Sequence, residues 1–323
     1  MKYSEAIRQA IIDSMSKDKN MKILGQGVWS PFYVGKTMDK VNVEFGNKRV
    51  IDTPVSENAV TAIAFGSALT GSSTLVIHPR MDFMILAMDA IVNAAAKWRY
   101  VLNWKGKIPF TIRTIINRGG EQGAQHSQSL QSWFCHIPGL KVVTPSNPED
   151  AYYLLRSCIE SPDPCIYIED RWSYDDEKHF DTSKTVPELS EISPRILKYG
   201  DHVTLVSYGF PISLCLEAAQ ELLNQNISVE VIDLRIISPM NLSAVNKSII
   251  KTGRLIVVDA SWESCSVASE IISQVSKTVF SNLRRAPIAV HLPSNPAPTS
   301  SALEKIFYFS KKEIMDAIRT VSG

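Results

Sequence analysis

Short apolar runs rich in β-branched residues alternate with longer segments of helical periodicity along almost the whole 323-residue chain. Such alternation is typical of parallel α/β layers, in which each strand is followed by a helix that covers one face of the sheet. The pattern occurs in two successive blocks, and the chain is long enough for two ordinary domains. We therefore expect an α/β protein of two domains, each with a mainly parallel sheet flanked by helices.

Residues 1–172 form the first expected domain and residues 193–323 the second. Between them, residues 173–192 are dense in Asp, Glu, Lys, Ser and Pro and have little hydrophobic periodicity, so we expect a linker there. The first block predicts strands at 21–25, 49–53, 73–78, 110–116, 140–145 and 164–169, and helices at 3–17, 57–69, 84–98 and 148–159. The second predicts strands at 202–209, 228–235, 254–260 and 288–293, and helices at 211–224, 241–251, 267–279 and 311–321.

Composition argues against several classes of protein. The chain has 34 Lys and Arg against 33 Asp and Glu and no basic run, so we expect no nucleic-acid partner. No apolar stretch is long enough to span a membrane, and the N-terminus lacks the apolar core of a signal peptide. The five cysteines lack CxxC spacing, which favours buried, reduced thiols and a cytoplasmic location.

Three segments place polar residues or glycines where strands are expected to end, which is where open α/β sheets bind ligands. In the first, Ser56 and Glu57 follow a strand and begin an apolar helix. The simplest interpretation is a helix start, with Ser56 as N-cap and the Glu57 carboxylate at the positive end of the helix dipole. A functional carboxylate is the alternative.

The second segment, residues 118–129, has three glycines followed by His126, Gln128 and several hydroxyl side chains. A loop of this kind can approach a ligand closely and deliver an imidazole to it, although a single loop histidine is often only solvated. In the third segment, residues 77–83, Arg80 could bind an anionic substrate group or pair with a carboxylate, and Phe83 could be a core residue.

No Walker loop, G-x-G-x-x-G after the first strand, G-x-S-x-G elbow or zinc-ligand spacing occurs. Instead, the order of motifs resembles the beta subunit of the decarboxylating component of 2-oxo-acid dehydrogenase complexes of the pyruvate type, within the transketolase-like superfamily. The resemblance is carried, in order along the chain, by LGQGV, DTPVSE, AMDAIVNAAAKWRY, GAQHSQS, PGLKVVTPSNPEDA, VIDLRIISP and KTGRLIVVDA.

The resemblance implies a pyrimidine-binding domain of thiamine-diphosphate enzymes followed by a transketolase C-terminal domain. It implies that Glu57 hydrogen-bonds a pyrimidine nitrogen of the cofactor, which a carboxyl group in an apolar cleft can do by sharing a proton. It also implies that Phe83 stacks on the aminopyrimidine and that His126 handles protons on the substrate or acceptor. Arg80 and Gln128 are the candidate substrate contacts.

The Gly-Asp-Gly…Asn segment, through which this superfamily holds Mg²⁺ and the diphosphate, is missing from the chain. The resemblance therefore implies an alpha-type partner that supplies the metal site, an alpha2beta2 heterotetramer, and a cofactor shared at the interface. The expected reaction is decarboxylation of a small 2-oxo acid, with transfer of the acyl unit to the lipoyl group of an acyltransferase.

Two departures from the family stand out. Its mammalian-type members have a potassium site whose matching positions here are Phe110, Cys158, Ile159, Ser161 and Asp163, and Ser161 stands in place of an Asp. Arg80 has no counterpart in the pyruvate enzyme and suggests a substrate with an extra anionic group, or another acceptor. Two alternatives therefore stay open, namely a split transketolase-like or synthase subunit that uses an aldehyde or sugar acceptor, and a non-catalytic scaffold subunit.

Overall fold

The computed structural model describes residues 1–322, and these group into two compact units. Unit 1 comprises Met1–Arg118 and Trp133–Ile192, whereas unit 2 comprises Gly119–Ser132 and Ser193–Gly323. The segment 173–192, expected as a linker, groups with unit 1, where the backbone N–H of Tyr3 donates to the carbonyl of Asp176 at 2.9 Å. Within residues 1–322, no helix combines the length and apolar character needed to cross a membrane.

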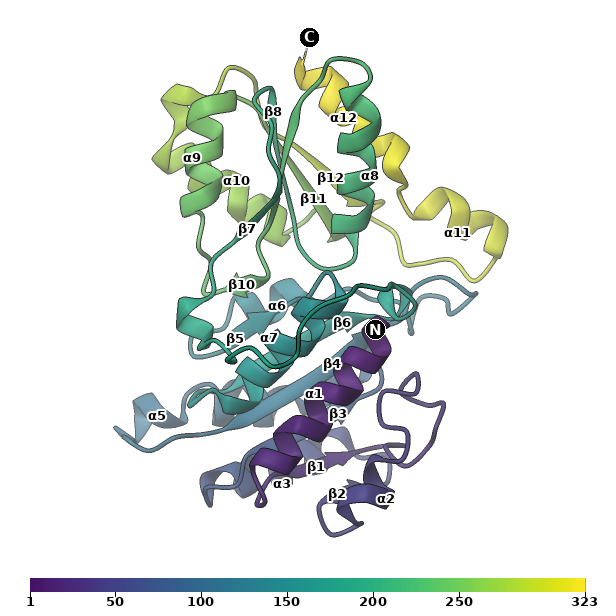
Figure 1. The fold of residues 1–323 in the computed structure, drawn as a ribbon, viewed down its shortest axis with the longest axis vertical. Coiled ribbons are helices and arrows are strands. Elements are labelled where there is room, and N and C mark those ends of the chain that lie inside the picture. The colour runs from purple at the N-terminus through teal and green to yellow at the C-terminus, as the bar shows by residue number, and fades with distance from the viewer. Residues whose placement is uncertain (323) are drawn as a thin grey trace. The chain divides into compact units, whose positions relative to one another are not determined.

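Unit 1 contains a parallel sheet with the order β5-β6-β4-β3-β1-β2 (Figure 1). Its strands are β1 (Lys22–Gly25), β2 (Val50–Asp52), β3 (Thr74–His78), β4 (Phe110–Ile116), β5 (Lys141–Val143) and β6 (Cys165–Asp170). All residues of β3, β4 and β6 are buried, which explains their nearly continuous apolar sequences. Parallel pairing brings the carboxyl ends of β1, β2 and β3 to one edge, where Gly25 lies level with Asp52 and Ile77.

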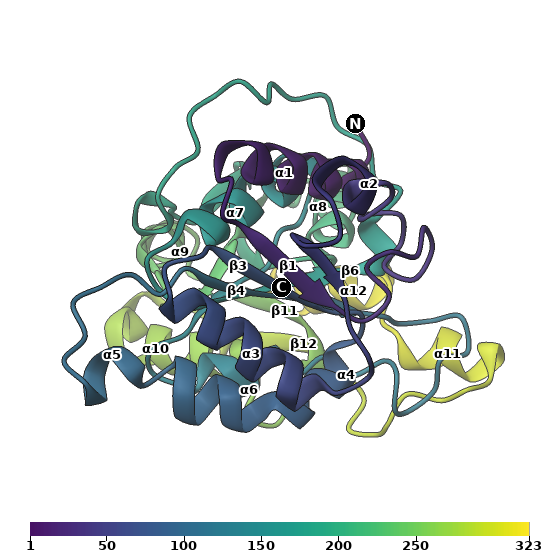
Figure 2. The ribbon, with the colours of Figure 1, turned by 90° about the horizontal axis from the view of Figure 1, so that it is seen from below.

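Helices cover both faces of this sheet. The helix α1 (Tyr3–Lys17) packs with α7 (Pro148–Glu160) on one face, while α3 (Glu57–Leu69) lies on the other (Figure 2). The expected helix 84–98 is a series of short turns, namely α4 (Met81–Met84), η1 (Ile85–Ala87), the π-helical η2 (Asp89–Ala95) and α5 (Trp98–Val101). The short helices α2 (Val41–Phe45) and α6 (Gln131–Cys135) were not expected, because one turn carries too little periodicity to detect.

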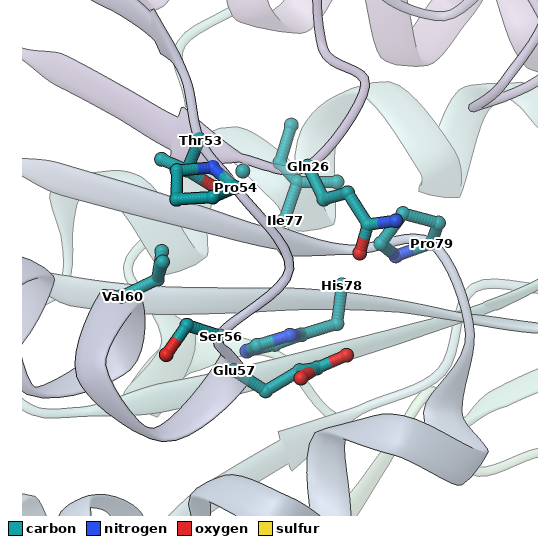
Figure 3. Close-up of a pocket in the computed structure, with 10 residues that line it drawn as sticks. Gln26, Thr53, Pro54, Ser56, Glu57, Val60, Ile77, His78 and Pro79 are labelled. Carbon is teal, nitrogen blue, oxygen red and sulfur yellow. The ribbon is translucent and has the colours of Figure 1, made fainter.

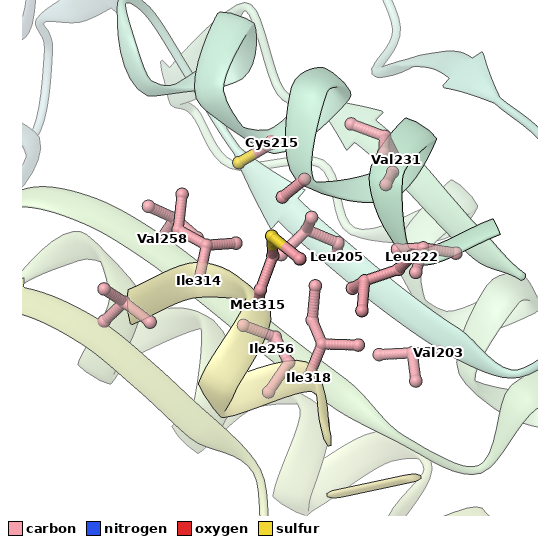
Figure 4. Close-up of a cluster of buried hydrophobic side chains, with 14 of the residues drawn as sticks. Val203, Leu205, Cys215, Leu222, Val231, Ile256, Val258, Ile314, Met315 and Ile318 are labelled. Carbon is pink, nitrogen blue, oxygen red and sulfur yellow. The ribbon is translucent and has the colours of Figure 1, made fainter. Parts of the chain in front are cut away.

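Unit 2 contains a five-stranded sheet with the order β12-β11-β8-β9-β7, in which only β7 is antiparallel to its neighbour. The elements of this unit are β7 (Arg195–Lys198), β8 (Val203–Ser207), α8 (Pro211–Leu223), β9 (Val229–Asp233), β10 (Ile236–Ser238), α9 (Ser243–Thr252), β11 (Leu255–Trp262), α10 (Val267–Thr278), β12 (Ile288–Leu292), α11 (Ser301–Phe307) and α12 (Lys311–Ser322). Apolar side chains from α8, α12 and the sheet form its core (Figure 4). The expected fold class, two mainly parallel sheets flanked by helices, is confirmed.

Candidate functional site

A cleft opens at the carboxyl edge of the unit 1 sheet, as expected for an open α/β layer (Figure 3). It is open to solvent, and the space that it shares with the adjoining solvent amounts to about 220 Å³. Its walls come from the ends of β1, β2 and β3 and from the first turn of α3, and they consist of Gly25, Gln26, Thr53, Pro54, Ser56, Glu57, Val60, Ile77, His78 and Pro79. The wall combines apolar residues with five polar ones, which offer hydroxyl, amide, imidazole and carboxylate groups to a small ligand.

Close backbone packing at the end of β1 shapes the floor of the cleft. A Cβ atom on Gly25 would lie 2.7 Å from the carbonyl oxygen of Ile77, so only glycine fits there without a shift of the strands. The turn after it is held by Asp52, whose Oδ1 accepts a hydrogen bond from the backbone N–H of Gly27 at 2.7 Å. The side chain of Gln26 then donates to the hydroxyl of Tyr33 at 2.7 Å, which fixes the rim of the cleft.

Glu57 begins α3 and directs a half-buried carboxylate into the cleft wall. Ser56 occupies the N-cap position, but its side chain caps no backbone N–H. Among residues 1–322 the carboxylate of Glu57 receives no hydrogen bond or ion pair, so the protein fold does not use it. A carboxyl group that has no partner within the protein can share a proton with a ring nitrogen, so Glu57 has the chemistry that the pyrimidine of thiamine diphosphate would require.

His78 ends β3 and lines the same cleft as Glu57 (Figure 3). Its side chain is buried, and its Nε2 atom lies 3.0 Å from Oγ1 of Thr61 on α3. Burial lowers the pKa of His78 to about 4, because the cationic form would lose its hydration. A neutral imidazole therefore faces the cleft near pH 7, and it is a polar group to which the sequence pattern assigned no role.

The lowered pKa of His78 predicts a pH-dependent stability. Between pH 6.5 and about 4 the unfolded chain binds a proton at this residue and the folded protein does not, so stability present above pH 6.5 is lost as the pH falls. We expect the titration of His78 to lower the free energy of unfolding by about 3 kcal/mol over this pH interval. Urea unfolding at several pH values should therefore show a weaker pH dependence for His78→Leu than for the native protein. An unchanged dependence would contradict the prediction, and exposed His202→Leu is the control.

Arg80 and Phe83 follow the end of β3 and are three residues apart. Arg80 directly precedes α4, and Phe83 lies within it. The side chain of Phe83 is 38% exposed, and it is not among the residues that line the cleft. Burial lowers the pKa of Arg80, and the neighbouring charge of Arg171 acts in the same direction. Arg80 therefore lies close to a second cation at this edge of the sheet.

A buried ion pair lies in the core of unit 1. Both side chains of the Arg113–Glu169 pair are 0% exposed, and their two hydrogen bonds measure 3.0 Å and 2.6 Å. Arg113 also donates to Oγ1 of Thr37 at 2.7 Å, and the hydroxyl of Tyr174 hydrogen-bonds Glu169. Since Thr37 lies in the irregular segment that follows Gly25, this network ties that segment to the central strands.

His126 and Gln128 lie in the loop 119–132, which groups with unit 2. Three glycines of this loop have φ angles between +65° and +71°, which is the left-handed region that glycine adopts at little cost. The backbone N–H of Glu121 donates to Glu304 at 3.0 Å, and Gln131 donates to the hydroxyl of Tyr208 at 3.1 Å. The loop is therefore anchored on both sides of the half-buried His126.

Two of the positions suggested for potassium, Ser161 and Asp163, contact cationic side chains of the protein instead. The carboxylate of Asp163 pairs with Arg99 and, at 3.0 Å, with the ammonium group of Lys141. Lys141 also donates to the hydroxyl of Ser161 at 3.4 Å. Burial would raise the pKa of Asp163, but the hydrogen bonds and charges of Lys141 and Arg99 outweigh it and lower the pKa. This carboxylate is already neutralised within the chain.

The structure thus brings together only part of the expected site within one unit. Glu57 and the neighbourhood of Arg80 and Phe83 belong to unit 1, whereas His126 and Gln128 belong to unit 2. Gln26 and Thr53 also line the wall, and no sequence motif assigned them a role, although both stand at expected strand ends and that position was a usable signal.

Residues 1–176 match the family described as the transketolase pyrimidine-binding domain, and residues 194–314 match the transketolase C-terminal domain. The chain is 34% identical to the pyruvate dehydrogenase E1 component subunit beta of Rhizobium meliloti, over 99% of this chain and 70% of that protein. It is 36% identical to the acetoin:2,6-dichlorophenolindophenol oxidoreductase subunit beta of Bacillus subtilis, over 99% of this chain and 96% of that protein.

Among solved structures, a split gene transketolase described as an inactive beta4 tetramer matches with a TM-score of 0.80. That match covers 99% of this chain and 98% of the other, and because the identity is 17%, it bears on the fold alone. The two domain matches and the two relatives span nearly the full length of the chain in one order. The chain therefore belongs to the transketolase-like family, together with the beta subunits of pyruvate dehydrogenase E1 components.

Proposed function

We propose that this chain is the beta-type subunit of a thiamine-diphosphate-dependent enzyme that decarboxylates a 2-oxo acid and passes the acyl unit to a lipoyl acceptor. The observation that carries the proposal is the carboxylate of Glu57, which lies in a cleft at the ends of three parallel strands and serves no contact of the fold. The names of the relatives support the reaction class. Thiamine diphosphate, when bound, supplies the carbon nucleophile that attacks the keto carbon.

In this proposal the residues of the chain bind and orient the cofactor and the substrate, and they exchange protons with them. Glu57 holds a proton at the pyrimidine nitrogen, and the ring of Phe83 stacks on the pyrimidine. His126 exchanges protons with the substrate or the acceptor, and Gln128 hydrogen-bonds the substrate. Neutral His78 lies beside Glu57 in the cleft wall and adds no cation to it.

The proposal includes a partner chain. Since the sequence lacks the Gly-Asp-Gly…Asn segment, an alpha-type subunit would hold Mg²⁺ and the diphosphate in an alpha2beta2 heterotetramer. The cofactor would then bridge the two chains. The five free cysteines fit a reducing, cytoplasmic compartment.

Reconstitution with an alpha-type chain tests this function. The complex should release CO₂ from a 2-oxo acid only when thiamine diphosphate, Mg²⁺ and both chains are present. Acylation of a lipoyl domain would support the dehydrogenase, whereas product formation only with aldehyde acceptors would favour a transketolase-like or synthase subunit. Full activity of the partner chain without this one would instead indicate a scaffold.

We also propose that the ion pairs of Asp163 replace a potassium ion. Exchange of potassium for tetramethylammonium, which is too large for the position, should leave the melting temperature and activity unchanged. The Lys141→Met variant removes one of the two cations and should lower the melting temperature by a few degrees. A large loss of stability of the native protein on potassium removal would contradict this interpretation.

A further inference from the structure

Two arginines follow the ends of β3 and β6, the strands on either side of β4, at the candidate ligand-binding edge of unit 1. The register pairs His78 with Thr114 and Thr114 with Ile168, so these three residues lie at one level of the sheet. Arg80 is two residues beyond that level after β3, and Arg171 is three residues beyond it after β6. Only β4 separates the two strands, so they lie about 10 Å apart, within reach of two arginine side chains.

Each of these arginines has a buried N–H group without a hydrogen-bond acceptor. Within residues 1–322, Nη1 of Arg80 and Nε of Arg171 are both shielded from solvent and unpartnered. Arg171 makes one backbone contact, from Nη2 to the carbonyl oxygen of Tyr33 at 3.0 Å. A buried donor left without an acceptor costs about 1–3 kcal/mol, and more when the group is charged. Two such donors on two cationic side chains at one edge favour an anionic acceptor there.

Neighbouring carboxylates do not accept hydrogen bonds from these two N–H groups. Glu169 is engaged by Arg113, and Asp170 is engaged by Arg118. Asp82 acts on Arg80 and favours its charged form, but this effect is smaller than the opposing effects of burial and of Arg171. The positive charge at this edge is therefore compensated only in part.

The two arginines lie next to the candidate cleft. Arg80 directly follows Pro79, a wall residue. Arg171 contacts Tyr33, whose hydroxyl accepts the hydrogen bond from Gln26, another wall residue. A molecule in the cleft could therefore extend a substituent toward both guanidinium groups.

We propose that Arg80 and Arg171 together bind an oxyanion on the substrate, distinct from the carboxylate that is lost as CO₂. The guanidinium group presents a planar fork of donors that matches carboxylate and phosphate oxygens, and the charge makes each hydrogen bond stronger than a neutral one. The ligand is thus either the second carboxylate of a dicarboxylic 2-oxo acid or the phosphate of a phosphorylated aldehyde acceptor. This inference rests on the proposed function for the identity of the reaction, but anion binding itself does not.

Calorimetric titration at low ionic strength tests the binding. The probes are glutarate and inorganic phosphate, titrated into the reconstituted complex and into the isolated full-length chain. Arg80→Leu and Arg171→Leu should each weaken binding of the preferred probe at least about tenfold, since a charged hydrogen bond contributes enough for that factor. The lysine variants should recover part of the affinity, because they keep the charge and lose the fork.

The matched control is Arg319→Leu, which removes an exposed arginine of unit 2 that pairs with Asp316. It should bind both probes like the native protein. Urea unfolding midpoints of the variants separate a loss of the site from a loss of the fold. Unchanged binding in both leucine variants of the site, or no binding of either probe to the native protein, would overturn the proposal.

Steady-state kinetics then identify the source of the anion. A dicarboxylic substrate predicts that Arg80→Leu lowers kcat/KM for the dicarboxylic 2-oxo acid far more than for its monocarboxylic analogue. A phosphorylated acceptor predicts that Arg80→Leu lowers kcat/KM far more for phosphorylated aldehydes than for unphosphorylated ones. The Glu57→Gln variant should keep native probe binding, so failure of the anion site and failure of the proposed catalytic role give different results.

Discussion

Replacement of Glu57 by glutamine should lower the turnover of the reconstituted enzyme by about 10²- to 10⁴-fold, the usual range for loss of a positioned proton donor or acceptor. Glutamine has nearly the same size, but its amide cannot share a proton with a ring nitrogen as a carboxyl group does. The stability of the chain should change little, because this carboxylate makes no contact that the fold needs. Steady-state turnover and the urea unfolding midpoint measure the two effects separately.

The control for this prediction is Glu44→Gln on the exposed surface of α2, which changes the same functional group away from the cleft. It should match the native enzyme in both measurements. If Glu57→Gln kept full activity in the complex, the cleft would have no catalytic role and the scaffold alternative would gain support. A large loss of stability would instead mean that the fold does depend on this carboxylate.

Removal of the Arg113 side chain should destabilise the folded chain by about 3–5 kcal/mol, because an unpaired charge then stays buried. In Arg113→Leu the carboxylate of Glu169 keeps only the hydroxyl of Tyr174 as a partner. Burial alone would lower the pKa of Arg113, but the charges of Glu169 and Tyr174 and the hydrogen bonds to Glu169 together outweigh it and raise the pKa. Urea unfolding with linear extrapolation measures the loss.

The double variant Arg113→Leu/Glu169→Leu should be more stable than either single variant, because no isolated charge remains in the core. It still loses the contacts to Thr37 and Tyr174, so cofactor binding should weaken even where the fold recovers. A double variant that is as unstable as the sum of the single variants would show that the two residues act independently. Arg319→Leu again serves as the surface control, with no measurable effect expected.

Local periodicity in the sequence was enough to predict most elements. The expected helices 3–17 and 57–69 agree with α1 and α3 at both ends, since each has a clear apolar face or a strand exit before it. One regular helix was expected at 84–98, and this was wrong. The segment contains the π-helical turn of η2, which depends on packing against α3. The short helix α11 was not expected, because seven residues give too short a pattern to recognise.

The sequence by itself determined the α/β class, the order of the strands along the chain and the glutamate that begins α3, because each depends on residues close to one another in the chain. Only the tertiary structure decided that Arg113 faces Glu169, that Arg171 joins Arg80, and that the loop of His126 groups with unit 2. Such pairings join residues more than fifty positions apart. They leave no period in the sequence, since they follow from which strand ends the sheet places side by side.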